Sequence, residues 1–213
     1  MLKLYTYWRS TAAYRVRIAL NLKNLKYQSI PIHLVKNGGE QNSDQFKTLN
    51  PQALVPALQT ETGEILTQSM AIIEYLEENY PDNTLLPEST TARAQCRAMA
   101  QVIACEVHPL NNLRVLKYLK SQQWQQQQVD DWYHHWVHQG FIAIEKSLDE
   151  RTHQYMFADY PCLSDIVLVA QIYNARRFEV CLDAYPNIQK IEAMCSKLSA
   201  FEDARPENQH DKG

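Results

Sequence analysis

Three polar residues, Arg9, Ser10 and Thr11, lie where one spacing of apolar residues ends and another begins. Residues 2–8 (LKLYTYW) are rich in aromatic side chains and partly alternate, which predicts a strand, whereas the apolar positions from Ala12 onward recur at helical spacing. The first turn of a helix presents unpaired N–H groups and the positive end of the helix dipole. A cation and two hydroxyls at this place favour binding of an anion, with an ordinary helix cap as the alternative.

The same two spacings divide the rest of the chain. Residues 27–34 (YQSIPIHL) predict a second strand, with Pro31 marking an edge position or an irregularity, so the first 34 residues form a strand–helix–strand unit. A short helix ending near Asn50, a hairpin around the turn at Gly63 and a helix beginning at Ser69 follow. Beyond the turn-rich segment 80–91 the strand signal ends, and four stretches have helical spacing: 92–120, 123–148, 163–178 and 187–201.

Composition argues against several classes of function. The formal net charge of −3 and the scattered basic residues give no reason to expect nucleic acid, and no stretch approaches the roughly 18 apolar residues of a membrane-spanning helix. Five cysteines without a C-x-x-C pair predict free thiols, so we expect a soluble, cytoplasmic protein. Asp130, His134 and His138 share a predicted helix face, but no other residue completes a metal site, so we expect no metal.

Several longer motifs follow one another in unbroken order from residue 2 to about 206: WRSTAAYRVRIAL, LNPQALVPAL, TQSMAIIEYLEENYP, HPLNNLRVLKYL and NARRFEVCLDAYP. This series resembles the zeta class of glutathione transferases, the maleylacetoacetate and maleylpyruvate isomerases. The resemblance implies an α/β plus all-α fold, in which a thioredoxin-like βαβ-ββα domain (1–81) binds glutathione. A linker (82–91), a helical-bundle domain with the substrate site (92–206) and a flexible tail (207–213) would follow. It also implies a homodimer and a role in the catabolism of aromatic amino acids or other aromatic compounds.

The resemblance implies glutathione as the cofactor and assigns its contacts. Ser10 is the hydroxyl nearest the sulfur, with Thr11 beside it, and the backbone of Val55 pairs with the cysteinyl moiety. The other implied contacts are Gln41 at the glycyl end, Gln68 and Ser69 at the γ-glutamyl carboxylate, and His108 and Asn112 beside the sulfur. The junction of the first strand and the first helix, Arg9 to Thr11, is called the seam below. The cysteine that the class usually has at the seam is replaced here by Thr11-Ala12, which rules out a protein thiol nucleophile in this motif.

The implied substrate is a dicarboxylate with a conjugated cis double bond, so arginines should surround it. Arg9 lies at the seam itself. Arg176, in NARRF, is favoured as the substrate clamp over Arg177, because adjacent residues of a helix face about 100° apart. The resemblance also implies substrate contacts for Asn111 and Arg114 of the motif HPLNNLR. In this motif His108 and Asn112 are four residues apart and would share one face of the predicted helix 92–120.

Structural alternatives stay open for most of these residues. They are an interhelical salt bridge for Arg176, a surface or dimer position for Arg114, an interior histidine for His108, an ordinary cap for Ser69 and an exposed loop position for Gln41. Arg15 and Arg17 flank an apolar face and are expected to be ion-paired structural residues. For the whole chain, the alternatives are a general glutathione transferase or dehalogenase and a non-catalytic scaffold of the same fold. The choice between the two maleyl diacids also stays open.

Overall fold

A four-stranded sheet with the strand order β2-β1-β3-β4 organises the first part of the computed structural model, which describes residues 1–212. Strand β1 (Leu2–Thr6) runs parallel to β2 (Tyr27–Pro31) and antiparallel to β3 (Ala57–Gln59), which forms a hairpin with β4 (Ile65–Thr67). The short β2 is an edge strand, as the proline at its end predicts. The predicted βαβ-ββα order is confirmed.

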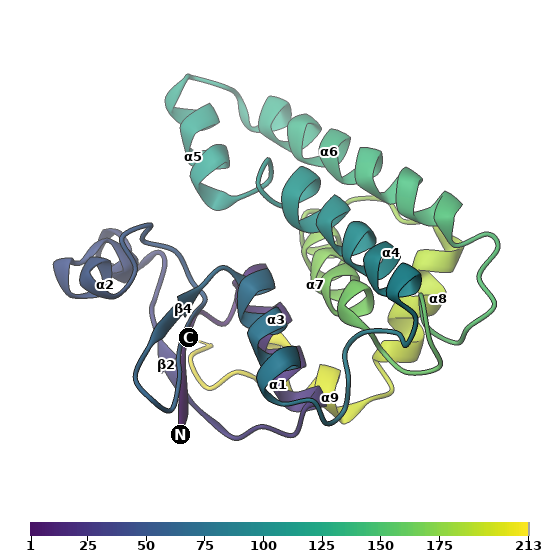
Figure 1. Cartoon of the computed structure of the whole chain (residues 1–213). Helices are drawn as coiled ribbons and strands as arrows, with labels where there is room; N and C mark the ends of the chain where they lie inside the picture. The colour runs from purple at the N-terminus through teal and green to yellow at the C-terminus, as the bar shows by residue number, and fades with distance from the viewer. Residues whose placement is uncertain (213) are drawn as a thin grey trace. The chain divides into compact units, whose positions relative to one another are not determined.

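Helices cover both faces of this sheet. Helices α1 (Thr11–Leu22) and α3 (Ser69–Asn79) lie side by side on one face, over a core that includes Leu4, Leu58 and Ile72 (Figure 1). The short helix α2 (Asp44–Leu49) follows two 3₁₀ turns, η1 (Lys36–Gly38) and η2 (Glu40–Asn42). On the other face a small apolar cluster joins α2 to the end of β1 and the start of β3: Tyr7, Trp8, Phe46 and Val55. This cluster holds Tyr7 and Trp8, the two residues that directly precede Arg9.

A buried ion pair closes the end of α3. Lys23 Nζ lies 2.8 Å from Glu77 Oε2 and donates to the carbonyl of Tyr80 at 2.7 Å, while Glu77 accepts hydrogen bonds from Thr84 Oγ1 and the Leu85 N–H. Burial opposes ionisation of Glu77, but these hydrogen bonds outweigh it and hold the pKa of that carboxyl below its usual value. The pair therefore ties the segment that leaves α3 to the end of α1.

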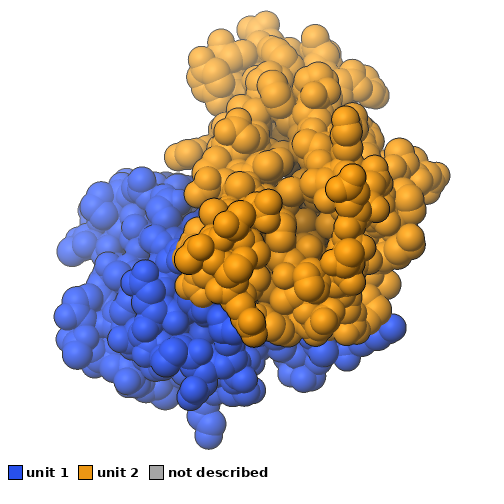
Figure 2. Space-filling model, turned by 45° about the vertical axis from the view of Figure 1, so that its right-hand side comes forward, with its two compact units in different colours: residues 1–85, 196–213 blue, residues 86–195 orange. Residues whose placement is uncertain are grey.

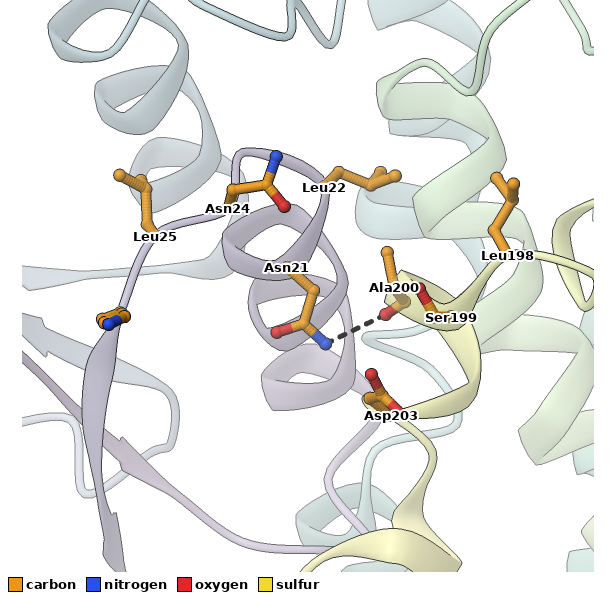
Figure 3. Close-up of a pocket in the computed structure, with 9 residues that line it drawn as sticks. Asn21, Leu22, Asn24, Leu25, Leu198, Ser199, Ala200 and Asp203 are labelled. Atoms are coloured by element: carbon orange, nitrogen blue, oxygen red, sulfur yellow. Dashed lines mark hydrogen bonds between the residues drawn. The ribbon is translucent and has the colours of Figure 1, made fainter.

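The chain divides into two units at Leu85/Leu86, and residues from 196 onward return to the first unit (Figure 2). Helix α9 (Ser199–Glu202) lies against the end of α1, where the Asn21 amide donates to the Ala200 carbonyl at 3.0 Å beside a cavity of about 430 Å³ (Figure 3). A 3₁₀ turn, η4 (Pro206–Asn208), follows. These findings correct the predicted boundaries: the helical domain ends at 195 rather than 206. Position 213 of the predicted flexible tail lies outside the described residues.

The second unit, residues 86–195, is entirely helical. Its elements are α4 (Thr90–Gln101), a π-helical segment η3 (Val102–Val107), α5 (Leu113–Ser121), α6 (Gln126–Ser147), α7 (Leu163–Arg177) and α8 (Pro186–Cys195). The predicted single helix 92–120 is wrong, because the chain forms turns instead of regular helix between His108 and Asn112. Pro109 lacks the N–H that a continuous helix needs, and Asn112 starts a new helix as its cap.

Helix α7 is the centre of the second unit, with most of its residues buried. Its first turn has a capping box in which Asp165 Oδ2 accepts from the Cys162 N–H at 2.8 Å, while Oδ1 accepts from the Met156 N–H at 3.0 Å. Burial raises the pKa of Asp165 to about 7, although these hydrogen bonds act against the rise. Within residues 1–212, none of the helices has the length and apolar character needed to cross a membrane.

Candidate active site

Ser10 is the N-cap of α1, where its Oγ accepts a hydrogen bond from the Ala13 N–H at 3.2 Å. A serine hydroxyl has two acceptor lone pairs and one donor, so the cap uses an acceptor and leaves the O–H to donate elsewhere. Ser10 is partly exposed, whereas Thr11 is only 5 % exposed. Capping and anion binding are therefore compatible in one residue, and Ser10 is better placed than Thr11 to donate to a bound anion.

The turn that carries Ser10 is held by a buried arginine. Arg17 is fully buried, and its guanidinium donates to the Trp8 carbonyl at 3.0 Å, the Tyr7 carbonyl at 3.4 Å and the Ala204 carbonyl at 3.0 Å. The Ser10 N–H donates to the Tyr7 carbonyl at 2.9 Å, which closes the turn. Arg17 is structural, as expected, but its role is to bind three carbonyls around the seam.

Arg9 lies on the outside of this turn. Its guanidinium carbon stacks 4.3 Å from the centre of the Trp8 ring, and the side chain is exposed. Among residues 1–212 it has no carboxylate partner. An arginine held over an aromatic ring with its donors unused can bind a carboxylate of a ligand.

Val55 presents a free peptide edge. The bond between Val55 and Pro56 is cis, and β3 begins two residues later. Neither the N–H nor the C=O of Val55 has a hydrogen-bond partner within the described part of the chain, although the residue is only 9 % exposed. A buried backbone donor and acceptor seek partners, and an extended peptide can supply both. This observation fits the pairing with the cysteinyl moiety that the sequence motif predicts.

The N-terminus of α3 offers a second anion site. Its N-cap is Gln68, which has a φ of 68° and makes no side-chain cap, so the first N–H groups of the helix stay available. Ser69 is not the cap, and the ordinary-cap alternative for it is therefore wrong. Instead its Oγ lies 3.4 Å from Nη1 of the buried Arg15. Hydroxyl, helix dipole and nearby cation together fit the γ-glutamyl carboxylate.

Two predicted glutathione contacts are less directly supported. The Gln68 amide donates to Gln52 Oε1 at 2.7 Å, so its side chain is already engaged. Gln41 lies in η2, and its Oε1 is buried without a hydrogen-bond partner among the residues described. Gln41 is therefore not the exposed loop residue of the alternative interpretation, and its amide oxygen can still accept a hydrogen bond.

The motif HPLNNLR in the second unit forms a turn rather than a helix face. His108 follows the π-helical segment, and the Leu110 carbonyl accepts from Trp132 Nε1 at 2.9 Å, which fixes the turn on α6. The predicted shared helix face of His108 and Asn112 is therefore wrong. Asn112 caps α5 by accepting the Arg114 N–H at 3.1 Å.

Asn111 and Arg114 differ sharply in exposure. Asn111 is buried, and its Nδ2 donates to the Tyr133 carbonyl of α6 at 3.2 Å, while its Oδ1 has no hydrogen-bond partner among the described residues. The substrate contact of Asn111 stays a prediction. Arg114 is exposed and has no carboxylate partner among residues 1–212. Arg114 therefore stays a candidate for substrate binding.

The two arginines at the end of α7 have different partners. Arg176 forms two hydrogen bonds with Glu192 of α8, at 3.0 and 2.5 Å, and this carboxylate raises the pKa of the guanidinium. This pair fits the interhelical salt bridge that was the alternative for Arg176, and its role as the substrate clamp stays a prediction. Arg177 has no carboxylate partner in the described chain; it stacks 5.0 Å from the Phe178 ring and donates to Asn174 Oδ1 at 3.4 Å. Sequence spacing could not show which of the two arginines has an acidic neighbour.

The histidines of α6 anchor the segment after α7. His134 Nε2 lies 2.7 Å from the Phe178 carbonyl, and His138 Nδ1 lies 2.7 Å from the Tyr185 hydroxyl. Burial, followed by the nearby histidines, lowers the pKa of His138. No cluster of three or more metal-ligating side chains occurs among residues 1–212. His134 and His138 therefore contact the segment after α7 through their ring nitrogens.

Comparison with known proteins places these features in a family. Residues 4–84 match the model of the glutathione S-transferase N-terminal domain. The chain is 47 % identical over 210 residues to a protein named maleylacetoacetate isomerase from Pseudomonas aeruginosa, covering 99 % of this chain and 98 % of that protein.

Solved structures agree with this assignment. The holo structure of a maleylpyruvate isomerase, described as a bacterial zeta-class glutathione transferase, has a TM-score of 0.94 and 44 % identity over 99 % of this chain and all of that one. A maleylacetoacetate isomerase from Anaeromyxobacter dehalogenans, solved with bound dicarboxyethyl glutathione and citrate, has a TM-score of 0.88 and 35 % identity over 100 % of this chain and 98 % of that one. The chain therefore belongs to the zeta class of glutathione transferases, among the maleylacetoacetate and maleylpyruvate isomerases.

Proposed function

We propose that this protein isomerises a maleyl-type diacid, maleylacetoacetate or maleylpyruvate, from cis to trans with glutathione. The observation that carries the proposal is the combination of a peptide-binding edge at Val55, a hydroxyl donor at the seam and an unpaired arginine beside it. The relative with bound dicarboxyethyl glutathione supports it, since that ligand joins glutathione to a unit with two carboxyl groups. A scaffold would need none of these features.

The α1 N-terminus contributes by favouring the ionised thiol of glutathione. A free thiol has a pKa of about 8.5, so only about 3 % is thiolate at pH 7. The Ser10 O–H and the helix dipole stabilise negative charge at this position, and a fall of about two pKa units corresponds to roughly 2.7 kcal/mol. The gain in thiolate is at most about thirty-fold, partly offset by weaker nucleophilicity, so the chain must also stabilise the diacid's transition state.

Bound glutathione supplies the sulfur nucleophile, which adds to the alkene carbon, allows rotation about the resulting single bond and leaves as the trans alkene forms. The chain's own residues hold the diacid and stabilise the enolate charge that develops on it. Arg9, Arg114 and Arg177 suit this task, since each lacks a carboxylate partner among the described residues. We therefore assign the substrate-binding role to Arg177 in place of Arg176.

An ultraviolet assay with and without glutathione tests the function. We expect the purified protein to isomerise maleylpyruvate or maleylacetoacetate only when glutathione is present. Arg9→Ala should raise KM for the diacid and leave the Kd for glutathione nearly unchanged, because Arg9 holds a substrate carboxylate. Equal loss of glutathione affinity would refute the role of Arg9, and a wild-type protein inactive on both diacids would refute the isomerase.

A homodimer and a cytoplasmic location remain predictions. The five cysteines are all free thiols in the structure, which supports a reducing compartment. Sedimentation velocity on the purified chain would test the dimer, and fractionation of the source cells would test the location.

A further inference from the structure

The peptide group in front of Arg9 is bound by a residue from the other end of the described chain. The Trp8 N–H donates to Asp211 Oδ2 at 2.9 Å, across a separation of 203 residues. Trp8 is only 7 % exposed, so this N–H has little access to water as a replacement partner. A buried donor that loses its acceptor is costly, and a carboxylate is the strongest acceptor that a side chain offers.

The segment that carries Asp211 is itself well held. Gln209 Nε2 donates to the carbonyls of Asp203 and Arg205, both at 2.9 Å, and Asn208 Nδ2 donates to the Glu202 carbonyl at 2.7 Å. The predicted flexible tail is therefore folded up to residue 212, and Asp211 reaches the seam from an ordered support.

The two contacts to Trp8 act on opposite sides of the residue. Arg17 Nη2 binds the Trp8 carbonyl at 3.0 Å, and Asp211 binds its N–H. Arg9 and Ser10 follow directly in the chain, so their positions depend on how this residue is oriented. The second carboxylate oxygen, Oδ1, is buried without a hydrogen-bond partner among residues 1–212.

We propose that Asp211 is a positioning residue for the catalytic turn, acting through the Trp8 peptide on Ser10 and Arg9. This inference rests on the proposed function, in which Ser10 faces the glutathione sulfur. Its consequence is that residues 206–212 belong to the machinery that sets the pKa of the bound thiol. Small displacements of a catalytic group can cause large losses of rate, so one remote hydrogen bond is sufficient for a measurable effect.

The test compares Asp211→Ala, Asp211→Asn and a matched control, Asp203→Ala, which removes an exposed carboxylate from the same segment. Ultraviolet difference spectroscopy of the glutathione complex over a range of pH gives the pKa of the bound thiol. We expect Asp211→Ala to raise the pKa of the bound thiol. We also expect it to lower kcat/KM about ten-fold, which is the smallest effect expected from loss of a charge-assisted hydrogen bond. Asp211→Asn keeps one acceptor oxygen and should stay within about three-fold of wild type, and Asp203→Ala should match wild type.

An unchanged thiol pKa in Asp211→Ala would overturn the inference, as would an Asp211→Asn variant that fails as badly as alanine. Melting temperatures of all variants identify loss of folding, and Asp211→Asn keeps the comparison usable if the alanine variant is unstable. The thiol titration needs no diacid. A wild-type protein without isomerase activity would therefore refute the proposed function and leave this measurement intact.

Discussion

We expect Arg177→Ala to lower the activity and Arg176→Ala to lower only the stability, although the two residues are adjacent. The guanidinium of Arg176 forms an ion pair with Glu192. Because the Arg176 side chain is 50 % exposed, this pair contributes about 0.2–1 kcal/mol to stability. Arg177 has only a long hydrogen bond to Asn174 and a ring contact. A charge-assisted contact to a diacid carboxylate contributes roughly 1.5–3 kcal/mol, which converts to a loss of about 10-fold to about 150-fold in kcat/KM.

Initial rates on maleylpyruvate at saturating glutathione check this prediction, with calorimetric titration of glutathione as the control. Arg177→Ala should lose kcat/KM within that range while its Kd for glutathione stays near wild type. Arg176→Ala should keep its activity and lose at most about 1 kcal/mol of unfolding free energy. Normal activity in Arg177→Ala together with a loss above about ten-fold in Arg176→Ala would refute the reasoning from ion pairing.

Three further predictions concern stability. Lys23→Met leaves the Glu77 charge buried and should cost about 3–5 kcal/mol in urea unfolding, whereas the double variant with Glu77→Leu should recover much of that loss; equal losses would contradict the role of the pair. Glu179 has a φ of 57° in the turn that ends α7, so Glu179→Gly should raise the unfolding free energy by about 0.5–1 kcal/mol, and a lower melting temperature would disprove this. Because the pKa of Asp165 is raised from 3.8 to about 7, the folded state holds a proton that the unfolded state has released between these values. The contribution of Asp165 to the free energy of unfolding is thus fully present below pH 3.8 and is lost as the pH rises through about 7. The melting temperature of Asp165→Asn should therefore depend less on pH than that of the wild type.

The local elements were predictable from the sequence because their signals are local. The alternation in β1, the helical spacing from residue 12 and the proline at the end of β2 each reflect a neighbour relation within a few residues. The break at 108–112 was also within reach, since Pro109 and a capping Asn112 are both visible in the motif. The regular apolar spacing on both sides of the break hid it.

The contacts that decide residue roles were not predictable in this way. Glu192 is 16 positions from Arg176, and Asp211 is 203 positions from Trp8, so neither pair has a spacing that identifies it. Arg17 illustrates the same limit: its position on an apolar helix face marked it as structural, but one of the carbonyls that it binds, that of Ala204, is 187 positions away. Ser10, in contrast, was found because a helix cap is a local feature.

The return of residues 196–212 to the first unit has a consequence for protein synthesis. A nascent chain that has released only residues 1–85 lacks the Ala204 carbonyl that Arg17 needs and the carboxylate that the Trp8 N–H needs. The strand–helix junction therefore completes its hydrogen bonds only after residues 204–211 have left the ribosome.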